Sequence, residues 1–288
     1  MQKQLELLQK YGIEVRGIRG QHFLIDPNIQ RKIVETVDVK PGDTIVEIGP
    51  GLGAITGLLL ESGAQVIAIE SDARFCDILK SEYGPQFSNL IVVHTDILKA
   101  NFERLIPKKK RNEKLKVVGN LPYYITSPIL FFLTSHRKFI DEATIMVQKE
   151  IADRLLAQPG SKDYGRLTLF VRFYAEVERV FNVSKTCFSP KPKVDSSVVK
   201  LTLRTKDIPV NETLLFEIIK HAFGHRRKNL VNALGYGLKE TYSKEMIESA
   251  LKASGISSKI RGEDLLMKDF LKLTEVLGTK SQLPASPT

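Results

Sequence analysis

The chain has 288 residues, of which 42% are hydrophobic and 26% are charged, and its formal net charge is +10. The length suggests one large domain plus a smaller one, and the composition is that of an ordinary globular protein. The two cysteines, Cys76 and Cys187, form no CxxC pair, which excludes a disulfide framework and a cysteine zinc site and fits a reducing compartment.

The N-terminus and the apolar runs bear on localisation. The first ten residues, MQKQLELLQK, lack the apolar core of a signal peptide. No apolar run approaches the roughly 18 residues that a membrane span needs. We therefore expect a soluble, cytoplasmic protein with no membrane partner. The positive net charge suggests an anionic partner without identifying it.

Strand and helix patterns alternate from residue 28 to about residue 150. The predicted elements are a helix at 28–37, a strand at 44–48, a helix at 54–61, a strand at 65–69, a helix at 72–80, and strands at 90–93, 115–118 and 143–147. Strands separated by helices imply right-handed crossovers and a parallel sheet.

After residue 147 the pattern changes. Helices are predicted at 149–157 and 166–174, two strands that could pair antiparallel at 175–183 and 197–204, and a linker at 205–211. Every later periodic stretch is helical, at 212–223, 227–234, 243–253 and 267–277. The predicted domains are residues 1–204 and 205–277, followed by a polar tail at 278–288 that we expect to be disordered.

The first chemical signal is the glycine-rich loop Gly49–Gly53 (GPGLG), between a strand and a helix. Glycines let the backbone approach a ligand closely, and a helix N-terminus offers free N–H groups to an anion. In a dinucleotide fingerprint the third glycine would fall at Thr56, where it is missing, or at Ala54, a tolerated variant. The spacing of the glycines disfavours an NAD-binding loop without excluding one. The methionine carboxylate of S-adenosylmethionine (SAM) would be an alternative anion.

Two acidic residues follow the next two strands. Glu70 directly follows the strand at 65–69, where a carboxylate can accept hydrogen bonds from both ribose hydroxyls of a nucleotide. Asp96 follows the strand at 90–93 and could accept one from an adenine amino group. The alternative role for Asp96 is to cap the next helix. Together with the loop, these acids favour an adenosine-containing ligand.

The motif Asn120-Leu121-Pro122-Tyr123 directly follows the fourth predicted strand. In a doubly wound sheet the first and fourth strands flank the topological switch point, so this motif would face the glycine loop. An adenine amine is a poor nucleophile because its lone pair is delocalised into the ring.

The residue types of this motif suit that chemistry. The Asn120 side-chain oxygen and the Leu121 carbonyl can each accept one N–H of the amine, which frees the lone pair to point at a methyl group. Pro122 fixes φ, and Tyr123 offers a face on which a base can stack. The alternative interpretation is a simple turn with a surface tyrosine.

These motifs resemble those of the ribosomal RNA adenine N6,N6-dimethyltransferases, in particular their small-subunit, KsgA-type branch. The resemblance covers residues 20 to about 277. Its further motifs are GQHFL at 20–24, VQKE at 147–150, YGRL at 164–167, FSPKPKVDS at 188–196 and AFGHRRK at 222–228. It implies a Rossmann-like class I SAM methyltransferase fold with a seven-stranded, mostly parallel sheet and a small all-helical C-terminal domain.

The resemblance also implies a function. SAM is the expected cofactor, and no metal is expected. The expected substrate is a pair of adjacent adenosines near the 3′ end of small-subunit (16S) rRNA, each methylated twice within a pre-30S particle during ribosome biogenesis. A monomer is expected.

Carried over residue by residue, the resemblance implies two sets of site residues. The cofactor would contact His22, Leu24, Gly49, Gly51, Glu70, Asp96 and Asn120. The target base would lie at Asn120, Leu121, Pro122, Tyr123 and Phe188. The family usually has asparagine where this chain has His22. Imidazole can still donate to the methionine carboxylate, and the alternative is a loop residue without ligand contact.

The remaining candidates have two interpretations each. Phe188 is either a core residue or the second face of a sandwich that holds a flipped adenine against Tyr123. Arg226, Arg227 and Lys228 are predicted to open a helix, where basic side chains oppose the helix dipole, so an RNA phosphate would account for them. The basic run at 108–111 has two interpretations, a solvent-exposed charged surface and an RNA contact, and the first is preferred.

Three other functions compete with this one. A large-subunit, antibiotic-resistance type of dimethyltransferase tends to carry the motif Asn-Ile-Pro-Tyr, whereas this chain has Leu121 at the second position of the motif. A non-enzymatic binder with the same fold would not need the intact motif and acids. An NAD oxidoreductase is disfavoured by the glycine spacing.

Overall fold

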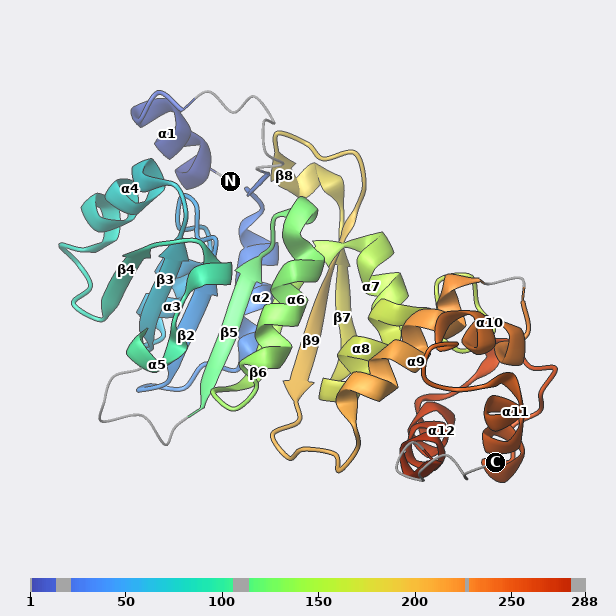
Figure 1. The fold of residues 1–288 in the computed structure, drawn as a ribbon. Coiled ribbons are helices and arrows are strands. Elements are labelled where there is room, and N and C mark those ends of the chain that lie inside the picture. Colours follow the sequence, from blue (N-terminus) through green and yellow to red (C-terminus); the bar gives the residue numbers. More distant parts are fainter. Residues whose placement is uncertain (1, 14–21, 106–113, 226–227, 281–288) are drawn as a thin grey trace. The chain divides into compact units, whose positions relative to one another are not determined.

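The structure, a computed structural model, describes residues 2–13, 22–105, 114–225 and 228–280 (Figure 1). The chain divides into two compact units, residues 1–152 with 174–205, and residues 153–173 with 206–288. Residues 153–173, which were expected in the first domain, therefore belong to the second unit. The roles expected of the two predicted domains, catalysis with SAM by residues 1–204 and recognition of the rRNA substrate by residues 205–277, stay predictions.

A seven-stranded sheet with the order β4-β3-β2-β5-β6-β9-β7 forms the centre of the first unit. Its strands are β2 (Thr44–Ile48), β3 (Gln65–Glu70), β4 (Leu90–His94), β5 (Leu115–Asn120), β6 (Ile140–Gln148), β7 (Ala175–Val183) and β9 (Ser196–Leu203). Strands β2 to β6 run parallel, and β9 pairs antiparallel with β6 and β7. This arrangement confirms the predicted Rossmann-like, mostly parallel sheet and the antiparallel pairing of the last two strands.

The central strand β2 determines where the loops meet. Ile48, its last residue, lies opposite Ile69 of β3 on one side and Gly119 of β5 on the other. All five residues of β2 are buried, as expected for a parallel strand covered on both faces. The segments that follow these three strands therefore come together at one edge of the sheet, at the switch point where ligands of such folds bind.

In the first unit one helix directly precedes the first parallel strand and four others connect the parallel strands in turn. They are α2 (Pro27–Val37), α3 (Thr56–Glu61), α4 (Ala73–Tyr83), α5 (Phe102–Leu105) and α6 (Thr126–Ser135). Asp26 caps α2 by accepting hydrogen bonds from the backbone of Asn28 and Ile29. The sequence pattern predicted no helix at α6. Its run TSPILFFLTS is apolar on most sides and therefore shows no helical period.

The N-terminal helix α1 (Gln2–Lys10) was not among the predicted elements. It contributes to a small second core, here called the N-terminal cluster, whose buried members are Leu7, Phe23, Leu52, Phe75 and Ile78. Lys10 and Tyr11 both contact Glu82 near the end of α4, and the Tyr11 hydroxyl donates to its carboxylate at 2.6 Å. These contacts hold α1 against α4 and the loop after β2.

A separate two-stranded sheet joins distant parts of the first unit. In it β1 (Phe23–Leu24) pairs antiparallel with β8 (Phe188–Ser189). This pairing ties the segment before α2 to the loop between β7 and β9.

The second unit is helical. It contains α9 (Glu212–Gly224), α10 (Leu230–Gly237), α11 (Lys244–Ala253) and α12 (Met267–Lys280), together with most of α8 (Arg166–Tyr174) and the end of α7 (Lys149–Leu156). Residues 278–280, predicted as part of a disordered tail, belong to α12, and residues 281–288 lie outside the described residues. No helix in the described ranges has the length and apolar character to cross a bilayer.

The predicted start of α10 is wrong. The helix begins at Leu230, because Asn229 caps it by accepting a hydrogen bond from the Asn232 backbone at 3.0 Å. Lys228 precedes this cap, so the helix-dipole argument does not apply to it; its ammonium lies 5.4 Å from the centroid of the Tyr236 ring. Arg226 and Arg227 lie outside the described residues.

Candidate active site

A cavity of about 350 Å³ opens at the carboxyl ends of β2, β3, β4 and β5. Small-molecule sites typically occupy roughly 300–1,000 Å³, so one ligand of cofactor size suits it. It brings together these predicted site residues: His22, Leu24, Gly49, Gly51, Glu70, Asp96, Asn120, Leu121, Pro122 and Tyr123.

The glycine loop follows β2 and forms one wall of this cavity. Gly49, Gly51 and Gly53 have φ values of 64°, 55° and 77°, which residues with an L side chain rarely adopt. A Cβ at Gly53 would lie 2.5 Å from the ring of Tyr83, and that buried tyrosine donates its hydroxyl to the Gly53 carbonyl at 2.9 Å. The loop is therefore folded tightly, with bare backbone where side chains would otherwise stand. The helix after it, α3, begins at Thr56, two residues later than predicted.

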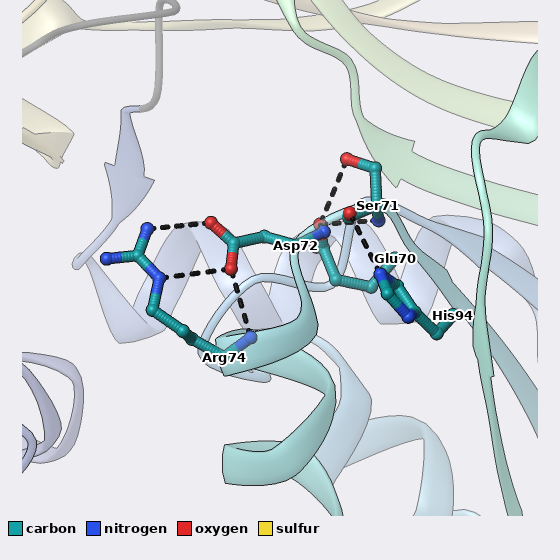
Figure 2. A network of polar contacts seen from close by, with 5 residues as sticks. All are labelled: Glu70, Ser71, Asp72, Arg74 and His94. Carbon is teal, nitrogen blue, oxygen red and sulfur yellow. Dashed lines mark hydrogen bonds and ion pairs between the residues drawn. The ribbon is translucent and has the colours of Figure 1, made fainter.

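Glu70 ends β3 and is held in place by backbone N–H groups (Figure 2). Its Oε2 accepts from Gly51 N at 3.1 Å, and its Oε1 accepts from Ser71 N at 2.7 Å and Asp72 N at 2.9 Å. Asp72 in turn caps α4 and pairs with the Arg74 side chain at 2.7 Å. The carboxylate of Glu70 thus faces the cavity in a fixed orientation.

Asp96 lies after β4 on the same edge. Its Oδ1 accepts a hydrogen bond from Leu98 N at 2.9 Å and caps the short 3-10 helix Ile97–Lys99, so the alternative role as a cap is present. No described residue donates to Oδ2 of this exposed carboxylate. The capping role therefore leaves one oxygen free to accept from a ligand.

Asn120 is the last residue of β5 and is half-buried at the cavity. Its Nδ2 donates to the His22 carbonyl at 3.1 Å, which leaves Oδ1 as the acceptor of the amide. A Cβ built at Gly49 would lie 3.9 Å from the Asn120 backbone oxygen, so the glycine loop and this residue stand next to each other. The structure thus brings the loop and the Asn-Leu-Pro-Tyr motif together as the sheet topology predicts.

Tyr123 continues the motif on a 3-10 helix, Tyr123–Ile125. Its hydroxyl lies 2.7 Å from Ser196 Oγ, and its ring centroid lies 5.7 Å from that of His22, with 33° between the planes. Burial raises the pKa of Tyr123 more than the bond to Ser196 lowers it. The neighbouring Tyr124 also lines the cavity and is 67% exposed at its rim.

His22 uses one ring nitrogen within the protein. Its Nδ1 lies 2.7 Å from the Pro190 carbonyl, and because a carbonyl only accepts, Nδ1 carries the proton. In the neutral ring Nε2 is then an acceptor. The predicted donation to a methionine carboxylate would require a second proton on this ring.

A model of the family described as ribosomal RNA adenine dimethylase matches residues 14–278 of the chain. The chain belongs to this family.

Curated relatives and solved structures agree with this assignment. This dimethylase is 40% identical to "Ribosomal RNA small subunit methyltransferase A" of Lachnoclostridium phytofermentans over 96% of both chains. It is 43% identical to the protein of the same name from Moorella thermoacetica, over 95% of this chain and 96% of the relative. A dimethyladenosine transferase from Plasmodium falciparum superposes with a TM-score of 0.79 at 30% identity, covering 90% of this chain and 98% of the other. The 23S rRNA methyltransferase ErmE superposes with a TM-score of 0.67 at 28% identity, covering 89% and 99%.

Phe188 stands apart from the other predicted residues of the dimethylase. It is 3% exposed, belongs to the main core with Leu24, Met146 and Val198, and is not among the residues that line the cavity. The pairing of β8 with β1 explains this position, because it opposes Phe188 to Leu24. Phe188 is therefore a core residue in this structure, and its contact with a target base stays a prediction.

Glu47 is a cavity residue of the dimethylase that the sequence analysis missed. It is 2% exposed on β2, and its Oε2 accepts a hydrogen bond from Thr56 Oγ1 at 2.6 Å. Burial raises its pKa from 4.5 to about 7, and the negative charge of Glu70 adds to the effect. The signal in the sequence is an acid inside an otherwise apolar strand, TIVEI. For metals, the described part of the chain holds no group of three or more His, Cys, Asp or Glu side chains arranged as ligands.

Because its pKa is raised, Glu47 should make the stability of the folded chain depend on pH. Because this pKa is about 7 in the folded chain and 4.5 ordinarily, the folded chain binds more protons between these values than the unfolded chain does. Proton binding to Glu47 therefore adds about 3 kcal/mol to the free energy of unfolding. This stabilisation is fully present below pH 4.5 and is lost as the pH rises through about 7.

The variant Glu47→Gln should remove this dependence, since its amide does not ionise and can still accept from Thr56. We expect the melting temperature of E47Q, relative to the unchanged protein, to be higher at pH 8 than at pH 5. The matched control is Glu61→Gln, a substitution of an exposed carboxylate at the end of α3. The same melting-temperature difference at both pH values would contradict the prediction.

Proposed function

We propose that this dimethylase transfers methyl groups from SAM to the N6 atoms of two adjacent adenosines near the 3′ end of small-subunit rRNA, twice each, within a pre-30S particle. The names of its relatives support the small subunit as substrate. The observation that carries the chemistry is the Asn120 amide, whose nitrogen is held by the His22 carbonyl so that its oxygen is the remaining acceptor at the cavity.

The residues at the cavity fit SAM. The bare backbone of Gly49 and Gly51 leaves room for a ligand against the loop. Glu70 presents a carboxylate suited to ribose, and Asp96 Oδ2 is an acceptor suited to an adenine amine. When bound, SAM supplies a methyl group that its sulfonium already activates. The protein then has to align the reacting atoms and stabilise the charge that develops on the amine.

The residues of the Asn-Leu-Pro-Tyr motif would perform that alignment. Asn120 Oδ1 would accept one N–H of the target amine, and the Leu121 carbonyl would accept the other. The aromatic faces of Tyr123 and Tyr124 would support the base at the mouth of the cavity. The net charge of +10 favours approach to an RNA. We further propose that the protein acts as a monomer in the cytoplasm.

The proposed function is tested by incubating the protein with labelled SAM and unmethylated small subunits, then mapping the modified bases. We expect two adjacent dimethylated adenosines near the 3′ end of the small-subunit rRNA. Large subunits from the same cells serve as the matched substrate control. Label on the large subunit alone would instead support an activity like that named for ErmE, and no label on either would contradict the proposal.

A further inference from the structure

Tyr83, the last residue of α4, is a buried polar residue that the proposed reaction does not use. Its hydroxyl donates to the Gly53 carbonyl at 2.9 Å and lies 3.5 Å from the Leu52 carbonyl. Burial raises the pKa of Tyr83, so this hydroxyl keeps its proton and stays a donor at neutral pH. Tyr83 is not among the residues that line the cavity, so it contacts the glycine loop without bordering the space for a ligand.

The Tyr83 ring occupies the space of two missing side chains. A Cβ at Gly53 would lie 2.5 Å from this ring, and a Cβ at Gly57, in the first turn of α3, would lie 2.9 Å from it. Gly49 and Gly51 line the cavity, whereas Gly53 does not. The first two glycines of the loop therefore leave room for a ligand, and the third makes room for Tyr83.

The Gly53 peptide holds one end of a turn that borders the cavity. Gly53 N donates to the Pro50 carbonyl at 2.9 Å and closes this turn, and Gly51 in its middle lines the cavity. The Gly53 carbonyl accepts a long bond of 3.5 Å from Gly57 N, so the Tyr83 hydroxyl is its closest donor among the described residues. Tyr83 therefore fixes the end of the turn whose middle would meet a ligand.

We propose that Tyr83 is a positioning residue for SAM, whose hydroxyl holds the turn at residues 50–53 in the shape that receives the cofactor. The inference rests on the proposed function, because it requires SAM in the cavity. Binding to a loop that is already ordered avoids the free-energy cost of ordering it. Tyr83 thus contributes to the affinity for SAM without touching it.

The substitution Tyr83→Phe tests this role, because phenylalanine keeps the ring and removes only the hydroxyl. SAM binding, measured by calorimetry at a temperature where the variant is folded, should weaken about 3- to 10-fold. The KM for SAM should rise by a similar factor in methylation of small subunits. The kcat at saturating SAM should stay unchanged, because Tyr83 touches no reacting atom.

Tyr164→Phe is the matched control. Tyr164 is also buried, its hydroxyl donates to the Leu265 carbonyl at 2.7 Å, and it belongs to the second unit and does not line the cavity. Each substitution leaves a buried carbonyl without this donor, so Y164F and Y83F should both lower the melting temperature. Only Y83F should weaken SAM binding. Equal weakening in both variants would show a general effect of lost stability and overturn the proposal, and so would unchanged binding in Y83F.

Gly57→Ala disturbs the same contact from α3. Its Cβ would displace the Tyr83 ring while the hydroxyl is kept, and Gly57 does not line the cavity, so weaker SAM binding in G57A would support the proposal. Gly224→Ala, at the end of α9, is the control, because a Cβ there meets nothing within 4 Å. Unchanged SAM binding in G57A would overturn the proposal.

The same measurements separate this inference from the proposed function. If the unchanged protein methylates small subunits while Y83F binds SAM normally, the inference fails and the proposed function stands. If the unchanged protein does not bind SAM, both fail.

Discussion

Replacing Asn120 with alanine should reduce methyl transfer to small-subunit rRNA by about 10²- to 10³-fold, the usual cost of removing one well-placed polar group that stabilises a transition state. The amide oxygen is the acceptor that would draw an N–H of the adenine amine, and its nitrogen is already bonded to the His22 carbonyl at 3.1 Å. SAM affinity, measured by calorimetry, should change far less than turnover. The effect should therefore fall on kcat.

Asn120→Asp separates the acceptor from the rest of the side chain. Aspartate keeps an oxygen for the amine but loses the donor to His22, so it should retain more activity than N120A and less than the unchanged protein. Asn232→Ala, at an exposed position on α10, provides the control. Unchanged turnover in N120A would remove Asn120 from the reaction.

Replacing Glu70 with alanine should weaken SAM binding by about 10- to 100-fold, because hydrogen bonds to a charged group contribute about 1.5–3 kcal/mol each. Two hydrogen bonds would account for this loss of affinity. One is the bond that the ribose donates to the carboxylate, and the other is the bond from Gly51 N, which holds the glycine loop in place.

Glu70→Gln distinguishes these sources from a simple loss of volume. Its amide nitrogen would face backbone N–H groups that need acceptors, so E70Q should also bind SAM weakly although its shape is preserved. Glu61→Ala, at the exposed end of α3, is the control. Calorimetry that finds equal affinity in E70A and the unchanged protein would take Glu70 out of the cofactor site.

Local patterns in the sequence determined most of the first unit. Short apolar runs bounded by turns identify the strands β2 to β5. The strands β7 and β9 were also predicted, as a pair that could run antiparallel, and they do. Because parallel strands end at one edge, residues at their carboxyl ends could be assigned to one site in advance, and Glu70, Asp96 and Asn120 do line one cavity. Where a run was apolar on most sides, as in α6, the pattern carried no period and the helix was missed.

What the sequence could not decide depends on contacts between distant segments. The burial of Phe188 depends on the pairing of β8 with β1, which sets it against Leu24. The proton on His22 Nδ1 follows from the Pro190 carbonyl, which is 168 positions away along the chain. Gly53 meets the Tyr83 ring and hydroxyl only because α4 packs beside the glycine loop. Periodicity and turn residues act within a few positions, and so the sequence by itself determined the elements and their order. Hydrogen-bond partners and burial arise only when the chain closes on itself, and so the tertiary structure alone decided which polar atoms remain available to a ligand.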